Sequence, residues 1–420
     1  MTDADAALRP LTQDELDKII KNHAMYSEGS VGGSRAVLTH HDLSKLNFRG
    51  ANLSGADFSH SRFSQSDMEG ADFSNAVFFG CDLRNANLKQ AKLNRADFRG
   101  AQLIGADLRG ADLNKADLRQ GQVMTFTKSK SNGADKYSGK TLFIGAHMSE
   151  ANLKGIRASD ADFTDADLSA VLLQDADLKN AKFIGANLSD SDLSGAVLTK
   201  ANLDGAIIAG TTFANNERGG LNLDNTVTDD PINSAITHSA KDLKGLLLAH
   251  VEWIESAGKA GTQLNLNGLD LRSLTTLNTI PLTACSAQEA IFIGMNMRSM
   301  HLQSAHLEKS DFRDCKLDKT DMRGSHFNNS NFMRAQLKGV KACPLKVGKG
   351  EIVTDMRKCN FKYANFENAD LRNVDFRESD LSFANFSGAN LTGAQFSGAT
   401  MTDVLSKNAQ IDDDSLSFFV

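Results

Sequence analysis

Residues 101–120 read AQLIGADLRGADLNKADLRQ, and this stretch decides the fold. Leucine stands at every fifth position, from Leu103 to Leu118, and an alanine precedes each leucine by two residues. A period of five fits neither the roughly 3.6-residue turn of an α-helix nor the two-residue repeat of a β-strand. The stretch therefore predicts a repeat architecture of another kind.

The same pattern extends in both directions and occurs twice in the 420 residues. The first array runs from residue 38 to Val123, then resumes in the same phase at Phe143 and continues to Phe213. The second array begins weakly at Leu266 and Leu271. It is clear over 292–337 and restarts at residue 356 after a shift of frame. Two repeat modules are predicted, each interrupted once.

The repeated unit is A-(D/N)-(L/F)-x-x, as in Ala51-Asn52-Leu53 and Ala389-Asn390-Leu391. This unit resembles the pentapeptide-repeat family of bacteria. The resemblance implies an all-β solenoid, a right-handed quadrilateral β-helix with four pentapeptides in each coil. It also implies that the large residue and the small residue point inward, while the other three face outward. Two such β-helices in tandem are expected.

A short amphipathic segment precedes each array and is expected to be a capping α-helix. Thr12-Gln13-Asp14-Glu15 is a capping box, followed by apolar residues and His23 on one helical face. Ser239-Ala240-Lys241-Asp242 repeats this logic and leads to His250. A solenoid needs such caps, because an open end exposes apolar core and unpaired backbone groups.

These observations predict an order of segments along the chain. They are an N-terminal segment with a capping helix (1–35), a first β-helix (36–213) with an insert (124–142), a linker (214–238), a second capping helix and turn (239–263), a second β-helix (264–411) with an insert (338–355), and a C-terminal tail (412–420).

Composition excludes several classes of protein. The formal net charge of −6 gives no overall attraction to nucleic acid or anionic lipid. The acidic N-terminus does not resemble a signal peptide, and no apolar run approaches the roughly 18 residues of a membrane span. Five cysteines without C-x-x-C spacing support neither disulfides nor a zinc site. We expect a soluble cytoplasmic protein without a cofactor.

Four histidines could be chemically active, but each also has a simpler structural interpretation. His23 and His250 are expected to bind backbone groups where each helix meets its first coil. His306 and His326 lie one coil apart, so a metal ion bound by both rings is an alternative interpretation. Two ligands alone, however, make a poor metal site. We predict no catalytic residue and no metal site.

The cysteines divide into two groups. Cys81, Cys315 and Cys359 occupy the small inward position and are expected to behave as small apolar residues. Cys285 and Cys343 lie outside the regular repeats and are expected to be more exposed. No residue at defined spacing supports an activated thiolate at either position.

The two inserts are basic on an acidic chain and are the candidate partner-binding segments. Insertions in repeat proteins often mark the binding face, where lysines steer encounter and aromatic residues anchor the contact. The candidate residues are Phe126, Lys128, Lys130, Lys136, Tyr137, Lys140, Lys341, Lys346 and Lys349.

We expect a non-catalytic scaffold or adaptor that binds a protein partner of unknown identity. Neither direct binding to nucleic acid nor binding to a membrane is expected. The sequence does not decide whether the protein is a monomer or a homo-oligomer. The resemblance also offers an alternative, because some family members protect type II topoisomerases by mimicking DNA. Aspartates are frequent in residues 143–213, which could form an acidic patch. An enzyme or metal-binding protein is the third alternative.

Overall fold

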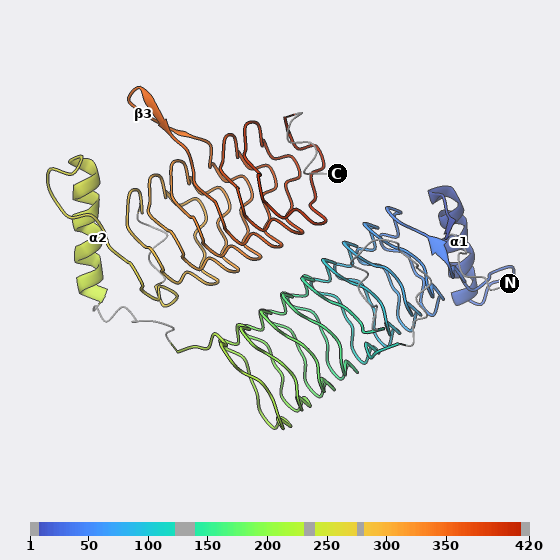
Figure 1. Ribbon diagram of the computed structural model, residues 1–420. Coiled ribbons are helices and arrows are strands. Elements are labelled where there is room, and N and C mark those ends of the chain that lie inside the picture. Colours follow the sequence, from blue (N-terminus) through green and yellow to red (C-terminus); the bar gives the residue numbers. More distant parts are fainter. Residues whose placement is uncertain (1–7, 122–138, 231–239, 275–280, 413–420) are drawn as a thin grey trace. The chain divides into compact units, whose positions relative to one another are not determined.

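The computed structural model describes residues 8–121, 139–230, 240–274 and 281–412. The chain forms two compact units, Met1–Asp230 and Pro231–Val420. Each unit is a right-handed β-helix of stacked four-sided coils, and a helix stands at its beginning (Figure 1). The predicted all-β solenoid with capping helices is confirmed.

Pairing between coils follows the repeat. The residue between the small and the large inward positions forms a parallel bridge with the residue twenty positions further on. One side of the first rod shows the resulting ladder, which runs through Val37, Asp57, Val77, Asp97 and Asp117. Three further ladders begin five, ten and fifteen residues later, so four pentapeptides close one coil.

The corners of the coils explain the fifth residue of each unit. This residue adopts a left-handed backbone, with φ of +66° at Gly50, +71° at Gly55 and +61° at His60. Left-handed backbone strains side chains with a Cβ atom but suits glycine, and asparagine and aspartate tolerate it. The frequent Gly, Asn and Asp at this position therefore follow from corner geometry.

The inward positions form one continuous core in each rod. The central residues Phe98 and Leu108 are fully buried, as is the small residue Ala106. Phenylalanines on successive coils stack face to face, with ring centroids 4.9 Å apart for Phe78 and Phe98. The predicted inward and outward assignment is confirmed.

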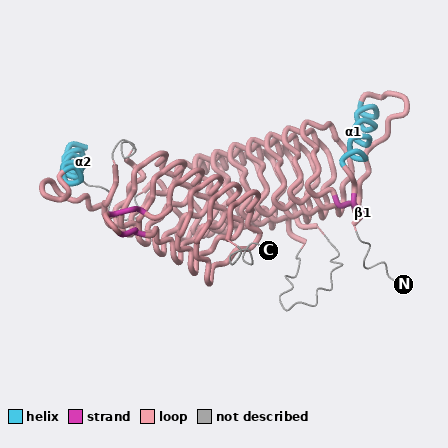
Figure 2. The backbone as a smooth tube through the Cα atoms, turned by 90° about the horizontal axis from the view of Figure 1, so that it is seen from above, coloured by secondary structure: helices cyan, strands magenta, loops and turns pink. Residues whose placement is uncertain are grey.

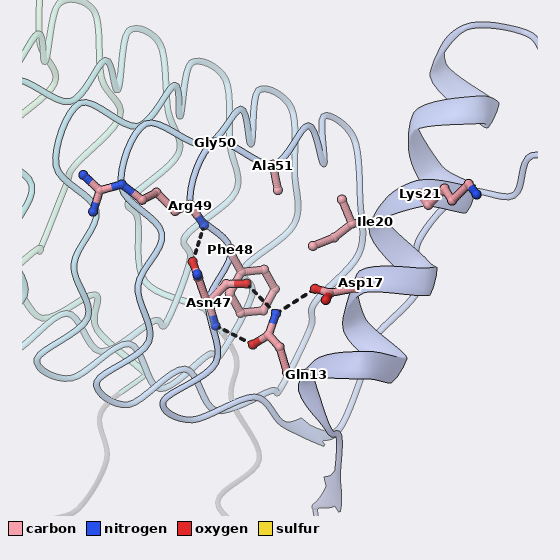
Figure 3. A pocket seen from close by; sticks show the side chains of 9 residues that line it. All are labelled: Gln13, Asp17, Ile20, Lys21, Asn47, Phe48, Arg49, Gly50 and Ala51. Atoms are coloured by element: carbon pink, nitrogen blue, oxygen red, sulfur yellow. Dashed lines mark hydrogen bonds between the residues drawn. The ribbon is translucent and has the colours of Figure 1, made fainter.

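The first rod begins with a composite cap. Strand β1 (Arg9–Pro10) pairs in parallel with β2 (His41–Asp42). On this side of the rod, β1 therefore takes the place of the preceding coil. Helix α1 (Gln13–Ser27) begins with the predicted capping box between Thr12 and Glu15. On the next side, the Gln13 amide donates to the Asn47 carbonyl and accepts from the Asn47 amide, both at 2.9 Å (Figure 3). A side chain thus replaces a strand.

The second rod repeats this plan with differences. It begins with α2 (Ala240–Glu255), and its first bridge joins Asn265 to Ser286. Further along, strands β3 (Leu345–Val347) and β4 (Gly350–Ile352) form an antiparallel hairpin (Figure 2). This hairpin projects from the coils (Figure 1). No helix in the described parts of the chain is long and apolar enough to cross a membrane.

The first rod extends beyond the predicted end at Phe213, into the segment 214–238 interpreted as linker. Bridges join Asn202 to Asn222 and Ile207 to Val227, which adds coil structure after Phe213. The sequence pattern does not reveal this coil, because Arg218 stands at the central position of the repeat, where Leu or Phe is usual. Its guanidinium group lies over the Phe213 ring, 5.0 Å from the centroid, and donates to the Phe213 carbonyl.

The expectation that Cys285 lies outside the coils is wrong. Cys285 is fully buried and occupies the small position two residues before the central Ala287. An alanine in the central position, where the repeat normally has Leu or Phe, concealed this unit. Burial raises the pKa of the Cys285 thiol to about 12.

Candidate partner-binding site

The two ends of the first insert meet where the chain leaves the rod and returns to it. We call such a place a joint. The Gly121 amide donates to the Gly139 carbonyl at 2.8 Å, which brings the two ends of the insert together. A Cβ atom on Gly121 would lie 2.9 Å from the Phe79 ring, so only glycine fits. Thr141 then takes the small inward position, where its hydroxyl accepts from the Gly100 amide at 3.1 Å.

The second insert uses the same joint. Thr354 is fully buried in the small inward position, and its hydroxyl accepts from the Gly324 amide at 3.0 Å. In an uninterrupted coil this corner amide donates to a backbone carbonyl of the next coil, as Gly80 does to Arg99. At the first joint the Thr141 hydroxyl accepts from the corner amide and donates to the Arg119 carbonyl at 3.1 Å. At both joints, therefore, a threonine hydroxyl takes the place of the carbonyl as acceptor of the corner amide.

These joints move the bounds of both inserts from the predicted 124–142 and 338–355, and they shorten the second insert. Leu142 bridges to Gln102 and therefore belongs to a coil. Lys341 bridges to Asp321 and Asp370, and Asp355 bridges to His326. The predicted bounds were misplaced because Thr141 and Thr354 are polar and Ala342 is small, so these units lack the usual residue types.

The hairpin of the second insert is a small two-stranded sheet with open edges. A turn at Gly348 and Lys349 connects the strands, and Gly348 has φ of +58°. Alternation places Leu345, Val347 and Ile352 on one face of the hairpin. At the base, a Cβ atom on Gly324 would lie 3.0 Å from the Leu345 Cβ atom and 3.3 Å from that of Ile352. The base is therefore packed against the rod.

The tip of the hairpin combines exposed apolar and basic side chains. Val347 is 53% exposed, and Val353, just after the hairpin, is 42% exposed. Lys346 and Lys349 are also exposed, and within the described ranges neither forms an ion pair. A surface of this kind can bury apolar area and attract an acidic group at the same time.

The coil faces present a different electrostatic surface. Arginine two residues after aspartate repeatedly forms a two-pronged pair with that aspartate in the same unit. Examples are Arg84 with Asp82 and Arg357 with Asp355, where the shortest nitrogen–oxygen distance is 2.7 Å. These pairs neutralise charge locally. On the hairpin, Glu351 lies opposite Lys346 in the register, but within the described residues neither Lys346 nor Lys349 forms an ion pair.

The structure brings only part of the predicted binding set together. Lys346 and Lys349 share the hairpin, while Lys341 lies on the adjoining coil face between Asp321 and Asp370. Lys140 is half-buried where the first insert returns to the rod. The other predicted residues, Phe126, Lys128, Lys130, Lys136 and Tyr137, lie outside the described residues.

The histidine and cysteine candidates show no arrangement suited to catalysis. His306 and His326 stack face to face, with centroids 5.1 Å apart and an interplanar angle of 13°. Their in-plane nitrogen lone pairs therefore do not converge on one point. No group of three or more potential metal ligands occurs in the described part of the chain. Burial and the Asp370 carboxylate raise the pKa of the Cys343 thiol.

A family model for repeats of this kind matches the same parts of the chain that form the coils. The model for pentapeptide repeats matches residues within 34–120, 141–208, 282–342 and 354–404, which is more than half of the chain. The chain belongs to the pentapeptide-repeat family. The matched segments stop and resume at 120 and 141, and again at 342 and 354, where the joints lie. Proteins of this family are generally structural or interaction proteins.

Several solved pentapeptide-repeat structures are similar to the chain. QnrB1, a plasmid-mediated fluoroquinolone resistance protein, is 21% identical, with a TM-score of 0.28 over 46% of this chain and 92% of QnrB1. HetL, involved in heterocyst differentiation regulation in the cyanobacterium Nostoc sp. strain PCC 7120, is 20% identical, with a TM-score of 0.18 over 96% of this chain and 98% of HetL.

Rfr23 from the cyanobacterium Cyanothece 51142 is 29% identical, with a TM-score of 0.16 over 30% of this chain and 91% of Rfr23. A search of curated protein sequences finds no relative of the chain.

Proposed function

We propose that this chain is a non-catalytic scaffold whose second rod presents the β3–β4 hairpin to an acidic surface of a protein partner. The observation that carries the proposal is a projecting hairpin with Lys346 and Lys349 exposed, and with Val347 exposed on the face opposite to Lys346. Binding segments that project from a rigid rod are common in repeat proteins. The rod fixes the position of the hairpin, and the hairpin provides the contact.

The distribution of acidic residues does not favour the alternative of DNA mimicry. In the first rod, Asp162, Asp167, Asp192 and Asp177 lie on four different ladders, one on each side of the coil. Their charge is therefore spread around the rod instead of forming one acidic face. A supercoiling assay with a type II topoisomerase, with and without a quinolone, tests this alternative directly.

The proposal is tested by affinity capture with a double variant, Lys346→Ser and Lys349→Ser. The change removes two positive charges from an exposed hairpin and should not affect the folded core. We expect one or more proteins bound by the wild type to be lost, with the largest difference at low salt, where charges are least screened. Bound proteins are identified by mass spectrometry.

A matched control removes two lysines from a coil face. Lys358→Ser and Lys362→Ser carry the same change in charge, but these lysines pair with Glu378 and Asp380. The control should retain the partner. If the hairpin variant and the control capture the same proteins as the wild type, the binding surface lies elsewhere.

A further inference from the structure

Both capping helices contain a fully buried histidine at equivalent positions, His23 in α1 and His250 in α2. The Ala36 amide donates to His23 Nδ1 at 2.9 Å, and the Leu264 amide donates to His250 Nδ1 at 3.1 Å. Ala36 and Leu264 each stand two residues before the first central leucine of their rod. Each ring therefore connects the cap to the start of the first coil.

These contacts fix the protonation state of the rings. A backbone N–H group can only donate, so Nδ1 must present a lone pair and the ring proton must lie on Nε2. In the first rod, His23 Nε2 then donates to the Ser54 carbonyl at 3.0 Å. A second proton, on Nδ1, would face the Ala36 N–H group and break that hydrogen bond.

The surroundings of His23 oppose a positive charge. Burial lowers the pKa of His23, the hydrogen bond to the Ser54 carbonyl partly opposes this, and the positive charge of Arg35 lowers it further. Arg35 lies close because its Nε atom donates to the Gly55 carbonyl at 2.6 Å. On the helix itself, the Tyr26 ring lies 5.9 Å from the His23 ring.

His250 lies in a similar but weaker setting. Burial lowers the pKa of His250, and the Thr283 carbonyl opposes this. The ring stacks on Trp253 with centroids 5.8 Å apart. Within the described residues, Nε2 of His250 makes no hydrogen bond of standard geometry, in contrast to Nε2 of His23.

The caps cover surfaces that would otherwise be open. In the first rod the backbone of Asn47 is bonded on its outer side by the Gln13 side chain, which α1 carries. Ile20, from the same helix, points toward Ala51 beside the buried Phe48 (Figure 3). Departure of α1 would expose the edge of the first coil at Asn47 and uncover its apolar end.

We propose that His23 and His250 are acid-sensitive latches, whose neutral rings hold the capping helices and whose protonation releases them from the rods. The latch contributes stability above the ordinary histidine pKa of about 6.5, where both folded and unfolded rings are neutral. This stability is lost as the pH falls from there toward the lower pKa of the folded state, because the unfolded cap binds the proton more readily. Release opens the edge of the first coil.

Hydrogen–deuterium exchange of the full chain at pH 7.5 and pH 5.0 tests the proposal, after correction for the intrinsic rate. We expect the protection of α1 and α2 amides to fall by about tenfold or more at pH 5.0, since one linked proton changes an opening equilibrium up to tenfold per pH unit. Coils distant from the caps should keep their protection. Equal protection of the helices at both pH values would overturn the proposal.

Variants assign the response to individual rings. In His23→Gln, α1 should lose its pH response while α2 keeps it, and His250→Gln should do the reverse. The controls are His60→Gln, whose ring lies tilted against His40, and His326→Gln, whose ring stacks on His306. Both controls should keep the wild-type response. If His60→Gln, and not His23→Gln, removes the response of α1, the latch is wrong.

A measurement on the wild type keeps the test valid if a variant does not fold. Nitrogen-15 NMR of the imidazole rings should show the Nε2–H tautomer for His23 and His250 at pH 7.5. Each ring should titrate below about pH 6.5, together with the loss of helix protection. An Nδ1–H tautomer at either histidine would contradict the proposed contact.

Discussion

The two inserts differ in length but leave their rods through the same joint. The first separates Gln102 from its ladder partner Leu142 by forty residues, and the second separates His326 from Asp355 by twenty-nine. Uninterrupted coils have a separation of twenty, as between Val37 and Asp57. In both cases, a threonine in the small inward position restores the ladder. Insert length is therefore independent of the register of the coils.

The first and largest test asks whether packing across a joint equals packing in an uninterrupted coil. Leu108, whose amide donates to His147 across the first joint, is fully buried, as is Leu83 in an uninterrupted part of the rod. Replacing either leucine by alanine should cost about 2–5 kcal/mol, measured by urea unfolding. The outward Gln102→Ala should cost little. A much smaller loss for Leu108 would show that the joint packs loosely.

The second test removes the hydroxyl that defines the joint. Thr141→Val and Thr354→Val keep the shape of the side chain but leave the Gly100 or Gly324 amide without its acceptor. Each change should cost about 1–3 kcal/mol of unfolding free energy. Serine at the same positions keeps the hydroxyl and should cost less. A loss for serine without a loss for valine would instead assign the effect to the threonine methyl group.

The third test separates backbone strain from contact with the hairpin. Gly324 and Gly294 have similar φ values of +69° and +72°, but only a Cβ atom on Gly324 would meet hairpin atoms. Gly294→Ala should cost about 1–2 kcal/mol for left-handed strain. Gly324→Ala should cost about 1–3 kcal/mol more through overpacking. The excess should disappear once the hairpin is deleted; if it persists, the hairpin does not cause it.

The fourth test, with the smallest expected effect, deletes the inserts. Removing residues 122–141 joins Gly121 to Leu142 and restores the spacing of twenty, so the free energy of unfolding should change by about 0.5 kcal/mol or less. Removing 344–352 places Val353 at a left-handed corner, which should cost about 1–2 kcal/mol unless Val353→Gly accompanies the deletion. Circular dichroism during urea unfolding checks both. A large loss in the first deletion would show that the insert supports its rod.

The sequence predicted the core of both rods because the period of five directly reflects which side chains point inward. It also predicted the helices, since the capping box at Thr12 and the apolar faces use ordinary helix chemistry. It missed units with an unusual residue at the central position of the repeat, namely the coil with Arg218 and the one with Ala287 after Cys285. In those units the neighbouring coils impose the conformation that the local pattern does not specify.

The candidate site was less predictable than the core. Lysines marked the inserts, but the sequence did not distinguish Lys341 on a coil face from Lys346 on a hairpin. That distinction depends on Ala342 filling a central position, which only the ladder between Asp321, Lys341 and Asp370 reveals. The latch contacts of His23 were expected only as a bond to backbone, without the atoms or the tautomer.

The spacing of the ladders also has a consequence for the order of folding. Coils whose partners are twenty residues apart can be added one after another from a preformed end, as in other solenoids. A joint interrupts this sequence, because a loop of forty residues must close before the next coil pairs, at an entropic cost of about 0.6 kcal/mol above a loop of twenty. The hairpin joint, with twenty-nine, adds about half as much. Growth of each rod should therefore pause at its joint, longer in the first rod than in the second.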